Sequence, residues 1–222
     1  MQNIHILMVD DHPIIIEGYQ NTLMATKKDD QTLVIDTANS CESANMLMQK
    51  AANEHPYDVC FFDISLPASA DGKITSGEDL AKISRLIMPN AKIIILTMFN
   101  ESYRIHSIVK AINPDGFLIK SDLTSSELAE AFQHIMFDPP YYSSTVSNYL
   151  NKAVVNEINL DDVNRKILHL LSKGIKTRSL TDHISLSMSA IEKRKKQLKI
   201  LFSISDGKDE SLIKEARNKG FL

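Results

Sequence analysis

The 222-residue sequence has few cysteines and no long apolar segment. Its two cysteines are Cys41 and Cys60, and the second lies inside an apolar run, so we expect no disulfide and a reducing compartment. No apolar run reaches the roughly 18 residues that a membrane-spanning helix needs. The N-terminus also lacks the basic region of a signal peptide. These absences predict a cytoplasmic protein that does not enter a membrane.

The seven histidines show no metal-binding spacing such as H-x-x-x-H. We interpret them as ordinary surface or core residues. His12 differs only in that it directly follows Asp11, which places it near any site that forms there.

Charge is distributed unevenly, although the net charge is only −3. Residues 159–222 carry 14 Lys and Arg against 8 Asp and Glu, a net charge of +6, whereas residues 1–158 carry 11 against 20, a net charge of −9. A basic C-terminal third attached to an acidic remainder suggests a nucleic-acid partner for that third. A solvated helical surface would give the same charge, so both interpretations remain open at this point.

Short apolar runs alternate with helical patterns over the first two thirds of the chain. Strands are expected at residues 5–9, 33–38, 59–62, 92–96 and 116–119, and helices at residues 13–26, 40–53, 77–88, 102–111 and 124–137. Continuous apolar runs of this length are typical of strands buried on both faces of a parallel sheet. The alternation predicts an α/β fold with a doubly wound five-stranded parallel sheet.

Polar residues close four of these apolar runs. Asp10 and Asp11 follow the first, and Asp63 follows the run at residues 59–62. Because sites form at the carboxyl ends of the strands in open parallel sheets, we expect the three carboxylates to converge. Two charges about 4 Å apart repel by roughly 1 to 4 kcal/mol, depending on the local dielectric. A hard divalent cation with oxygen ligands is the usual reason for such crowding.

Thr97 and Lys120 close the other two runs and complete the set. A hydroxyl and an ammonium beside carboxylates suit phosphoryl transfer. Asp63 is the candidate nucleophile. Mg²⁺ held by Asp11 and Asp63 would neutralise developing charge, while Lys120 and Thr97 would contact phosphoryl oxygens. Each residue alone would be an ordinary turn former, helix cap or surface charge, and only the joint pattern favours a site.

This order of residues resembles the receiver domain of bacterial two-component response regulators, a flavodoxin-like fold, over residues 1–138. The segments D-I-S-L-P at residues 63–67 and D-G-F-L-I-K-S-D at residues 115–122 also resemble that family. The resemblance implies that a sensor histidine kinase phosphorylates Asp63. It implies that Asp11, Asp63 and the Ser65 carbonyl bind Mg²⁺ and that Asp10 helps through water. It also implies that Thr97 and Phe117 form a switch pair.

Three features depart from the family pattern. Met98 follows the switch threonine, where the family usually has a small residue, and it could narrow access to the phosphoryl group. Ser65 and Phe99 occupy positions that tune phosphoryl lifetime. The segment at residues 68–76 is longer than usual and contains an Asp-Gly turn signal.

The C-terminal residues show the order of a helix-turn-helix domain. Asp161 is a candidate N-cap for a helix that ends at Gly174, a short helix is expected at residues 177–184, and Ser187 is a candidate cap for a basic helix at residues 188–202. A helix of this kind fits the major groove of double-stranded DNA. The candidate DNA contacts are Glu192, Lys193, Arg194, Lys196 and Lys199.

This region resembles the LuxR-type helix-turn-helix of NarL-type response regulators. A fourth helix at residues 210–219 resembles the family's dimer-forming helix, which implies a homodimer. We therefore expect a receiver domain at residues 1–138, a linker at residues 139–158 and a small all-α DNA-binding domain at residues 159–222. The family favours T-V-K at the start of the recognition helix, where this chain has A-I-E.

Two other functions are compatible with parts of the sequence. A phospho-regulated protein-interaction module would use the divergent C-terminal domain to bind a protein instead of DNA. A phosphatase that forms an aspartyl-phosphate would resemble an Asp-x-Asp arrangement, but Ser65 stands where its general acid would be. The main hypothesis is a transcription regulator and not an enzyme.

Overall fold

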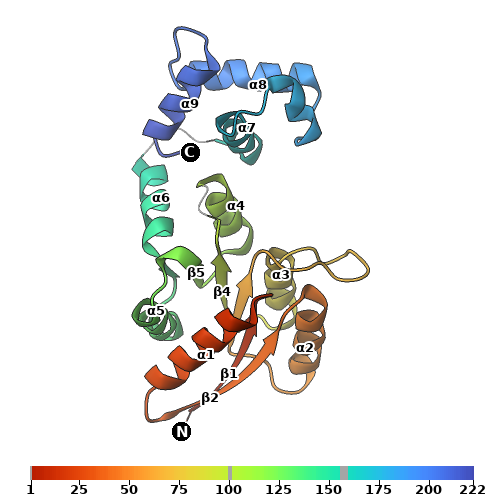
Figure 1. The fold of residues 1–222 in the computed structure, drawn as a ribbon, viewed down its shortest axis with the longest axis vertical. Helices are drawn as coiled ribbons and strands as arrows, with labels where there is room; N and C mark the ends of the chain where they lie inside the picture. Colours follow the sequence, from red (N-terminus) through yellow and green to blue (C-terminus); the bar gives the residue numbers. More distant parts are fainter. Residues whose placement is uncertain (1, 100–101, 156–159) are drawn as a thin grey trace. The chain divides into compact units, whose positions relative to one another are not determined.

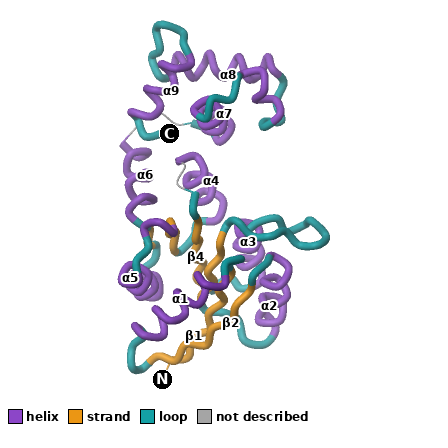
Figure 2. Tube along the Cα trace, viewed as in Figure 1, coloured by secondary structure: helices purple, strands orange, loops and turns teal. Residues whose placement is uncertain are grey.

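The computed structural model describes residues 2–99, 102–155 and 160–222. The chain forms two compact units: the first contains all six strands of the sheet, and the second contains residues 102–107 together with residues 147–155 and 160–222. Figure 2 shows that the first unit combines helices with strands, whereas the second is helical. None of the helices in the described part of the chain has the length and apolar character that crossing a membrane requires.

The sheet is entirely parallel, with the strand order β2-β1-β3-β4-β5-β6. Its strands are β1 (Gln2–Val9), β2 (Gln31–Ala38), β3 (Val59–Asp63), β4 (Lys92–Thr97), β5 (Gly116–Ile119) and β6 (Tyr141–Tyr142). This confirms the predicted α/β fold with a parallel sheet. The predicted number of five strands is wrong, because β6 adds a sixth at the edge beside β5. Two residues are too few for a recognisable apolar pattern, and β6 lies in the predicted linker.

Helices cover both faces of the sheet (Figure 1). Helices α1 (Pro13–Thr26) and α5 (Ser125–Phe137) pack against each other, and so do α2 (Cys41–Asn53) and α3 (Gly77–Ile87). Helix α4 (Ser102–Ile112) connects β4 to β5. Proline at the first position of α1 favours the start of the helix, because the amides of the first turn have no partner within the helix and proline has no amide hydrogen.

Caps fix the starts of two of these helices. Before α2, the Ser40 side chain accepts from the Ser43 amide and the Ser43 hydroxyl accepts from the Ser40 amide, which forms a capping box. Before α5, Thr124 accepts from the Glu127 amide. The Glu127 carboxylate accepts instead from the Tyr141 hydroxyl at 2.6 Å, so it ties α5 to the sixth strand.

One core of the first unit lies between the sheet and the pair α1 and α5. Alternate residues of each strand point to opposite faces, and Ile4, Ile6 and Met8 of β1 face this core. Phe61 of β3 stacks on Phe132 of α5, with ring centroids 6.4 Å apart. β3 and β5 are buried along their whole length, as predicted from their continuous apolar runs.

Residues 160–222 of the second unit form a helical domain with its own core. Its elements are α7 (Asp162–Ser172), the 3-10 helix η2 (Thr177–Asp182), α8 (Met188–Leu201) and α9 (Asp209–Asn218). Asp161 and Ser187 cap α7 and α8, as their positions predict. Its apolar core includes Leu168, Ile191, Leu198, Leu212 and Phe221. Helix α6 (Ser144–Val155) lies within the predicted linker, and from Ser147 onward it belongs to the second unit.

Candidate functional site

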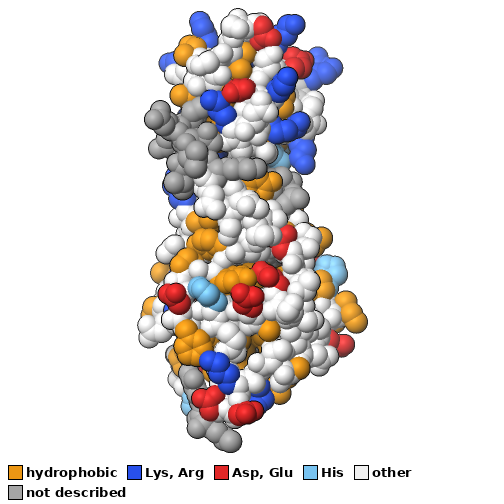
Figure 3. Space-filling model, turned by 90° about the vertical axis from the view of Figure 1, so that its left-hand side faces the viewer, with side chains coloured by type: hydrophobic (Ala, Val, Ile, Leu, Met, Phe, Trp, Pro, Cys, Tyr) orange, Lys and Arg blue, Asp and Glu red, His pale blue; other side chains and the backbone are white. Residues whose placement is uncertain are grey.

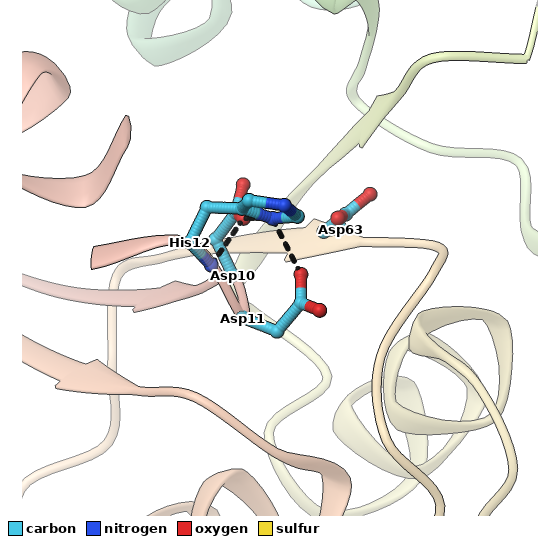
Figure 4. A group of neighbouring side chains, drawn as sticks. All are labelled: Asp10, Asp11, His12 and Asp63. Atoms are coloured by element: carbon cyan, nitrogen blue, oxygen red, sulfur yellow. Dashed lines mark hydrogen bonds and ion pairs between the residues drawn. The ribbon is translucent and has the colours of Figure 1, made fainter. Parts of the chain in front are cut away.

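Three carboxylates meet at the carboxyl end of the sheet. Asp10 and Asp11 follow β1, and Asp63 is the last residue of β3, the neighbouring strand. Asp10 and Asp63 are only 2% and 3% exposed. Together with His12 they each offer a ligand atom, and these atoms lie within 4.8 Å of one another (Figure 4). The structure brings the three predicted carboxylates into one cluster.

Lys120 supplies the positive charge of this cluster. Its ammonium lies 2.7 Å from Asp10 Oδ2 and 2.8 Å from Asp63 Oδ2, and its side chain is 6% exposed. Burial opposes the charged form of the lysine, but the hydrogen bonds that its ammonium donates to Asp10 and Asp63 outweigh burial and raise the pKa of Lys120. The ammonium therefore remains charged, and it already bridges two carboxylates from different strands.

His12 belongs to the cluster, a role that the sequence suggested only through its position next to Asp11. Its Nδ1 lies 2.7 Å from Asp11 Oδ1 and 3.3 Å from Asp10 Oδ1, and its backbone amide donates to Asp10 Oδ1 at 3.0 Å (Figure 4). The side chain of His12 is 62% exposed, so it covers the carboxylates from the solvent side.

The remaining predicted residues lie on the neighbouring strands and loop. Thr97 ends β4 and is fully buried, and its hydroxyl accepts from the Phe99 amide at 3.0 Å. Phe117 lies on β5 with its ring fully buried. The Ser65 amide donates to Asp63 Oδ1 at 3.3 Å, which places Ser65 directly against the carboxylate.

A pocket of about 360 Å³ opens beside Lys120 and is lined by Tyr19, Met98 and Leu128, among others. Met98 is 66% exposed, so its long side chain stands at the mouth of the site and is not packed into it. Burial raises the pKa of Tyr19, and the negative charges of Asp10 and Asp63 raise it further. The phenol is therefore neutral near the site, and it adds no negative charge to the cluster.

The donor set fits a hard divalent cation. The carboxylates of Asp10, Asp11 and Asp63 offer oxygen atoms, which Mg²⁺ and Ca²⁺ prefer, and thiol ligands are absent from the described cluster. Lys120 and the buried Thr97 stand on adjacent strand ends, β5 and β4. Such an arrangement can bind a cation and a phosphoryl group side by side.

In the second unit, the charged residues of α8 fall into two groups. Glu192, Lys193 and Lys196 are exposed. Arg194 instead pairs with Asp161 at 2.6 Å, and Lys199 pairs with Asp209 at 2.6 Å. The sequence indicated a basic helix, but it could not indicate which charges are used within the domain.

Lys195 is the most buried of the basic residues of α8. It is 5% exposed, donates to the Thr177 hydroxyl at 2.6 Å and pairs with Asp209 at 2.8 Å. It therefore ties α8 to both η2 and α9. Lys and Arg side chains are also frequent on the face of the second unit seen in Figure 3.

Comparison with known proteins identifies the class of this chain. Residues 6–133 match the response regulator receiver domain, more than half of the sequence. The chain belongs to the response regulator receiver domain family, which confirms the resemblance inferred from the strand-end residues.

Full-length similarity extends beyond that domain. The chain is 24% identical over 203 residues to the oxygen regulatory protein NreC of Staphylococcus epidermidis, covering 86% of this chain and 87% of that protein. It is 24% identical over 199 residues to the transcriptional regulatory protein RcsB of Salmonella typhi, covering 88% and 87%.

Solved structures of RcsB share the fold. A structure of two RcsB dimers bound to two parallel DNAs gives a TM-score of 0.63 at 19% identity, covering 97% of this chain and 98% of that one. A structure of an RcsB–DNA complex gives a TM-score of 0.62 at 20% identity, with the same coverage.

Proposed function

We propose that this chain is a cytoplasmic transcription regulator that is switched by phosphorylation of Asp63. The observation that carries the proposal is the position of the Lys120 ammonium, 2.7 Å from Asp10 and 2.8 Å from Asp63. A buried lysine that bridges two carboxylates at a sheet edge is poised to follow one of them when that carboxylate gains a phosphoryl group.

A phosphohistidine of a sensor kinase would be the physiological donor. An Asp63 carboxylate oxygen attacks phosphorus, a P–O bond forms, and the P–N bond breaks as neutral imidazole leaves with a proton from solvent. Lys120 then pairs with a phosphoryl oxygen, and the Thr97 hydroxyl, which accepts from the Phe99 amide, donates its hydrogen to another phosphoryl oxygen. Thr97 and Phe117 act as the switch pair of a two-state receiver.

The carboxylate cluster would hold Mg²⁺ during transfer. Asp11, Asp63 and the Ser65 carbonyl are the proposed direct ligands, and Asp10 contributes through water. A bound divalent cation would offset the negative charge that phosphorylation adds. The ligand atoms of Asp10, Asp11 and Asp63, which lie within 4.8 Å of one another, support this assignment.

DNA is the proposed partner of the second unit. Helix α8 follows a capped turn and exposes Lys193 and Lys196, which can reach phosphates and guanine edges. Glu192 at the same face would repel phosphate but can accept from cytosine N4. Arg194 and Lys199, also candidate contacts, would have to leave their partners Asp161 and Asp209 to reach DNA.

Dimerisation completes the proposal. RcsB was solved as dimers bound to DNA, and it resembles this chain over nearly its whole length. A homodimer would place two α8 helices in successive major grooves. The proposed receiver spans residues 1–138, the linker residues 139–158 and the DNA-binding domain residues 159–222.

Phosphorylation is tested with acetyl phosphate and Mg²⁺. Asp63→Asn should abolish incorporation of labelled phosphate. Asp30→Asn is the matched control, because Asp30 is an exposed carboxylate in the turn before β2 and should label normally. Full labelling of Asp63→Asn would exclude Asp63 as the acceptor.

DNA binding is tested separately with genomic fragments in a gel shift over a range of salt. A protein that neutralises phosphates binds less tightly as salt rises, with a steep logarithmic slope. If the C-terminal domain binds a protein partner and gives no salt-dependent shift of DNA, the interaction-module hypothesis is favoured instead.

A further inference from the structure

The first turn of α6 is held by a carboxylate from a distant part of the chain. Asp122 Oδ2 accepts from the Thr145 backbone amide at 3.0 Å, and Asp122 Oδ1 accepts from the Thr145 hydroxyl at 2.9 Å. The Ser143 hydroxyl donates to Asp122 Oδ2 at 2.7 Å. Three hydrogen bonds therefore converge on one side chain, and one of them satisfies a backbone amide of the first helical turn.

Ser143 extends this contact to the sheet. It is fully buried, and its hydroxyl also accepts from the backbone amide of Ile119, the last residue of β5, at 3.2 Å. The backbone amide of Ser143 donates to the Phe117 carbonyl at 3.0 Å. The start of α6 is thus fastened both to Asp122 and to the carboxyl end of β5.

Asp122 is charged in this arrangement. Burial acts to raise its pKa, but hydrogen bonds from Ser143 and Thr145 outweigh burial and hold the pKa below its usual range. An ionised carboxylate at a helix N-terminus is also favoured by the helix dipole. Hydrogen bonds to a charged acceptor are stronger than neutral ones, so this contact contributes more than an ordinary cap.

The same short element carries the lysine of the phosphorylation site. The 3-10 helix η1 runs from Lys120 to Asp122 and is closed by a hydrogen bond from the Leu123 amide to the Lys120 carbonyl. Lys120 faces Asp63 at one end of this single turn, and Asp122 faces Thr145 at the other. Because η1 is a single turn, a movement of the backbone at Lys120 also moves the backbone at Asp122.

We propose that Asp122 is a positioning residue that couples the phosphorylation state of Asp63 to the order of the first turn of α6. The proposal rests on the proposed function, because it takes phosphorylation of Asp63 as the input. Helix α6 begins in the first unit and continues into the second from Ser147 onward, so its first turn lies on a covalent path between the two units.

The direction of the effect follows from the space that a phosphoryl group on Asp63 would take up. Lys120 Nζ and Asp63 Oδ2 are already 2.8 Å apart, so a phosphoryl group on Asp63 displaces the ammonium. Lys120 draws η1 with it, the three hydrogen bonds on Asp122 lengthen, and the first turn of α6 loosens. Coupling of this kind is reciprocal, so loss of the Asp122 contacts also changes the response to phosphorylation.

Amide hydrogen exchange on the full chain tests the coupling. Asp122→Asn should accelerate exchange in the first turn of α6 by about tenfold or more without any phosphoryl donor, since a hydrogen bond to a charged group contributes about that much. Asp138→Asn is the matched control: Asp138 is an exposed carboxylate at the end of α5 and should leave α6 unchanged. Thr145→Val removes one donor only and should give a smaller increase.

Acetyl phosphate with Mg²⁺ supplies the second arm of the experiment. In the wild type, phosphorylation should speed exchange in the same turn of α6, and in Asp122→Asn it should add little. Exchange in α6 that is unaffected by Asp122→Asn would overturn the proposal, as would an equal response to phosphorylation in both proteins. Failure of Asp63 to become labelled at all would count against the proposed function instead, and the two failures are therefore distinguishable.

Discussion

Gly77, the first residue of α3, packs directly against the backbone carbonyl of Asp63. A Cβ at position 77 would overlap the Asp63 carbonyl oxygen and also crowd its carbonyl carbon. The Gly77 amide donates to the Ile64 carbonyl at 3.2 Å, so the start of α3 sets the backbone position of the proposed phosphoacceptor. The site thus depends on a residue that carries no side chain.

Gly77→Ala should therefore damage both stability and phosphorylation. Overpacking of this kind costs about 1–3 kcal/mol of unfolding free energy, and a shift of the Asp63 backbone should slow labelling by acetyl phosphate. Gly18→Ala is the matched control, because a Cβ at Gly18 within α1 meets nothing within 4 Å. Gly18→Ala should raise the unfolding free energy by about 0.5–1 kcal/mol, because alanine has a higher helix propensity than glycine. Urea unfolding and labelling rates measure both effects, and equal behaviour of the two variants would contradict the packing argument.

Asp11→Asn should stabilise the protein in the absence of divalent cations. Asp11 is the carboxylate of the cluster that Lys120 does not contact, and like charges about 4 Å apart repel by roughly 1 to 4 kcal/mol. Removal of its charge should also abolish the stabilisation that added Mg²⁺ gives by binding the folded state. Thermal unfolding at pH 8 with EDTA or with Mg²⁺ measures both effects. Asp30→Asn should behave like the wild type, and an undiminished Mg²⁺ effect in Asp11→Asn would exclude it as a ligand.

Lys193→Ala and Arg194→Ala should differ although the residues are adjacent. Lys193 is exposed, so its loss should weaken DNA binding and reduce the logarithmic salt slope by about 1, with stability unchanged. Arg194 pairs with Asp161 at 2.6 Å and donates to Asn164 at 3.1 Å. Its loss should lower unfolding free energy by about 0.5–1 kcal/mol, with a smaller change in the salt slope. Gel shifts over a series of salt concentrations measure the DNA contacts, and urea unfolding measures stability. A larger loss of salt slope in Arg194→Ala than in Lys193→Ala would show that Arg194 leaves Asp161 and Asn164 to bind DNA.

Asp209 should make the second unit sensitive to acid. Burial acts to raise its pKa, but hydrogen bonds from Lys195 and Lys199 outweigh it, so the pKa of Asp209 is lowered. A depressed folded pKa contributes stability above the unfolded pKa of about 3.9, and this stability is lost as pH falls through the folded pKa. Asp209→Asn should be less stable than the wild type at pH 7, and the difference should disappear in acid. Glu210→Gln, an exposed neighbour, should show no such pattern in thermal unfolding against pH.

The sequence predicted the parts of the fold that local patterns determine. Helix α1 runs from Pro13 to Thr26, the range expected from the sequence, and α2 ends at Asn53, as expected. The carboxylates at the ends of β1 and β3 meet because parallel strands end at one edge. These features need only neighbouring residues and the alternation of strands and helices.

Contacts between distant residues explain what the sequence did not show. The strand at Tyr141 and the start of α6 are fixed by bonds to Glu127, Ile119 and Asp122, and none of these pairings leaves a periodic pattern. The short helix expected at residues 177–184 is the 3-10 helix η2, Thr177–Asp182, and the sequence did not indicate which type of helix forms there. It is held by the bond from Lys195 of α8 to the Thr177 hydroxyl, which local sequence does not reveal.

The most direct test of the account is to locate the phosphoryl group on the wild-type protein. After incubation with acetyl phosphate and Mg²⁺, peptide mass spectrometry should find one phosphoryl group, on the peptide that contains Asp63 and on that residue. A phosphoryl group on Asp10 or Asp11, or a protein that remains unmodified under conditions in which Mg²⁺ stabilises it, would contradict the central claim.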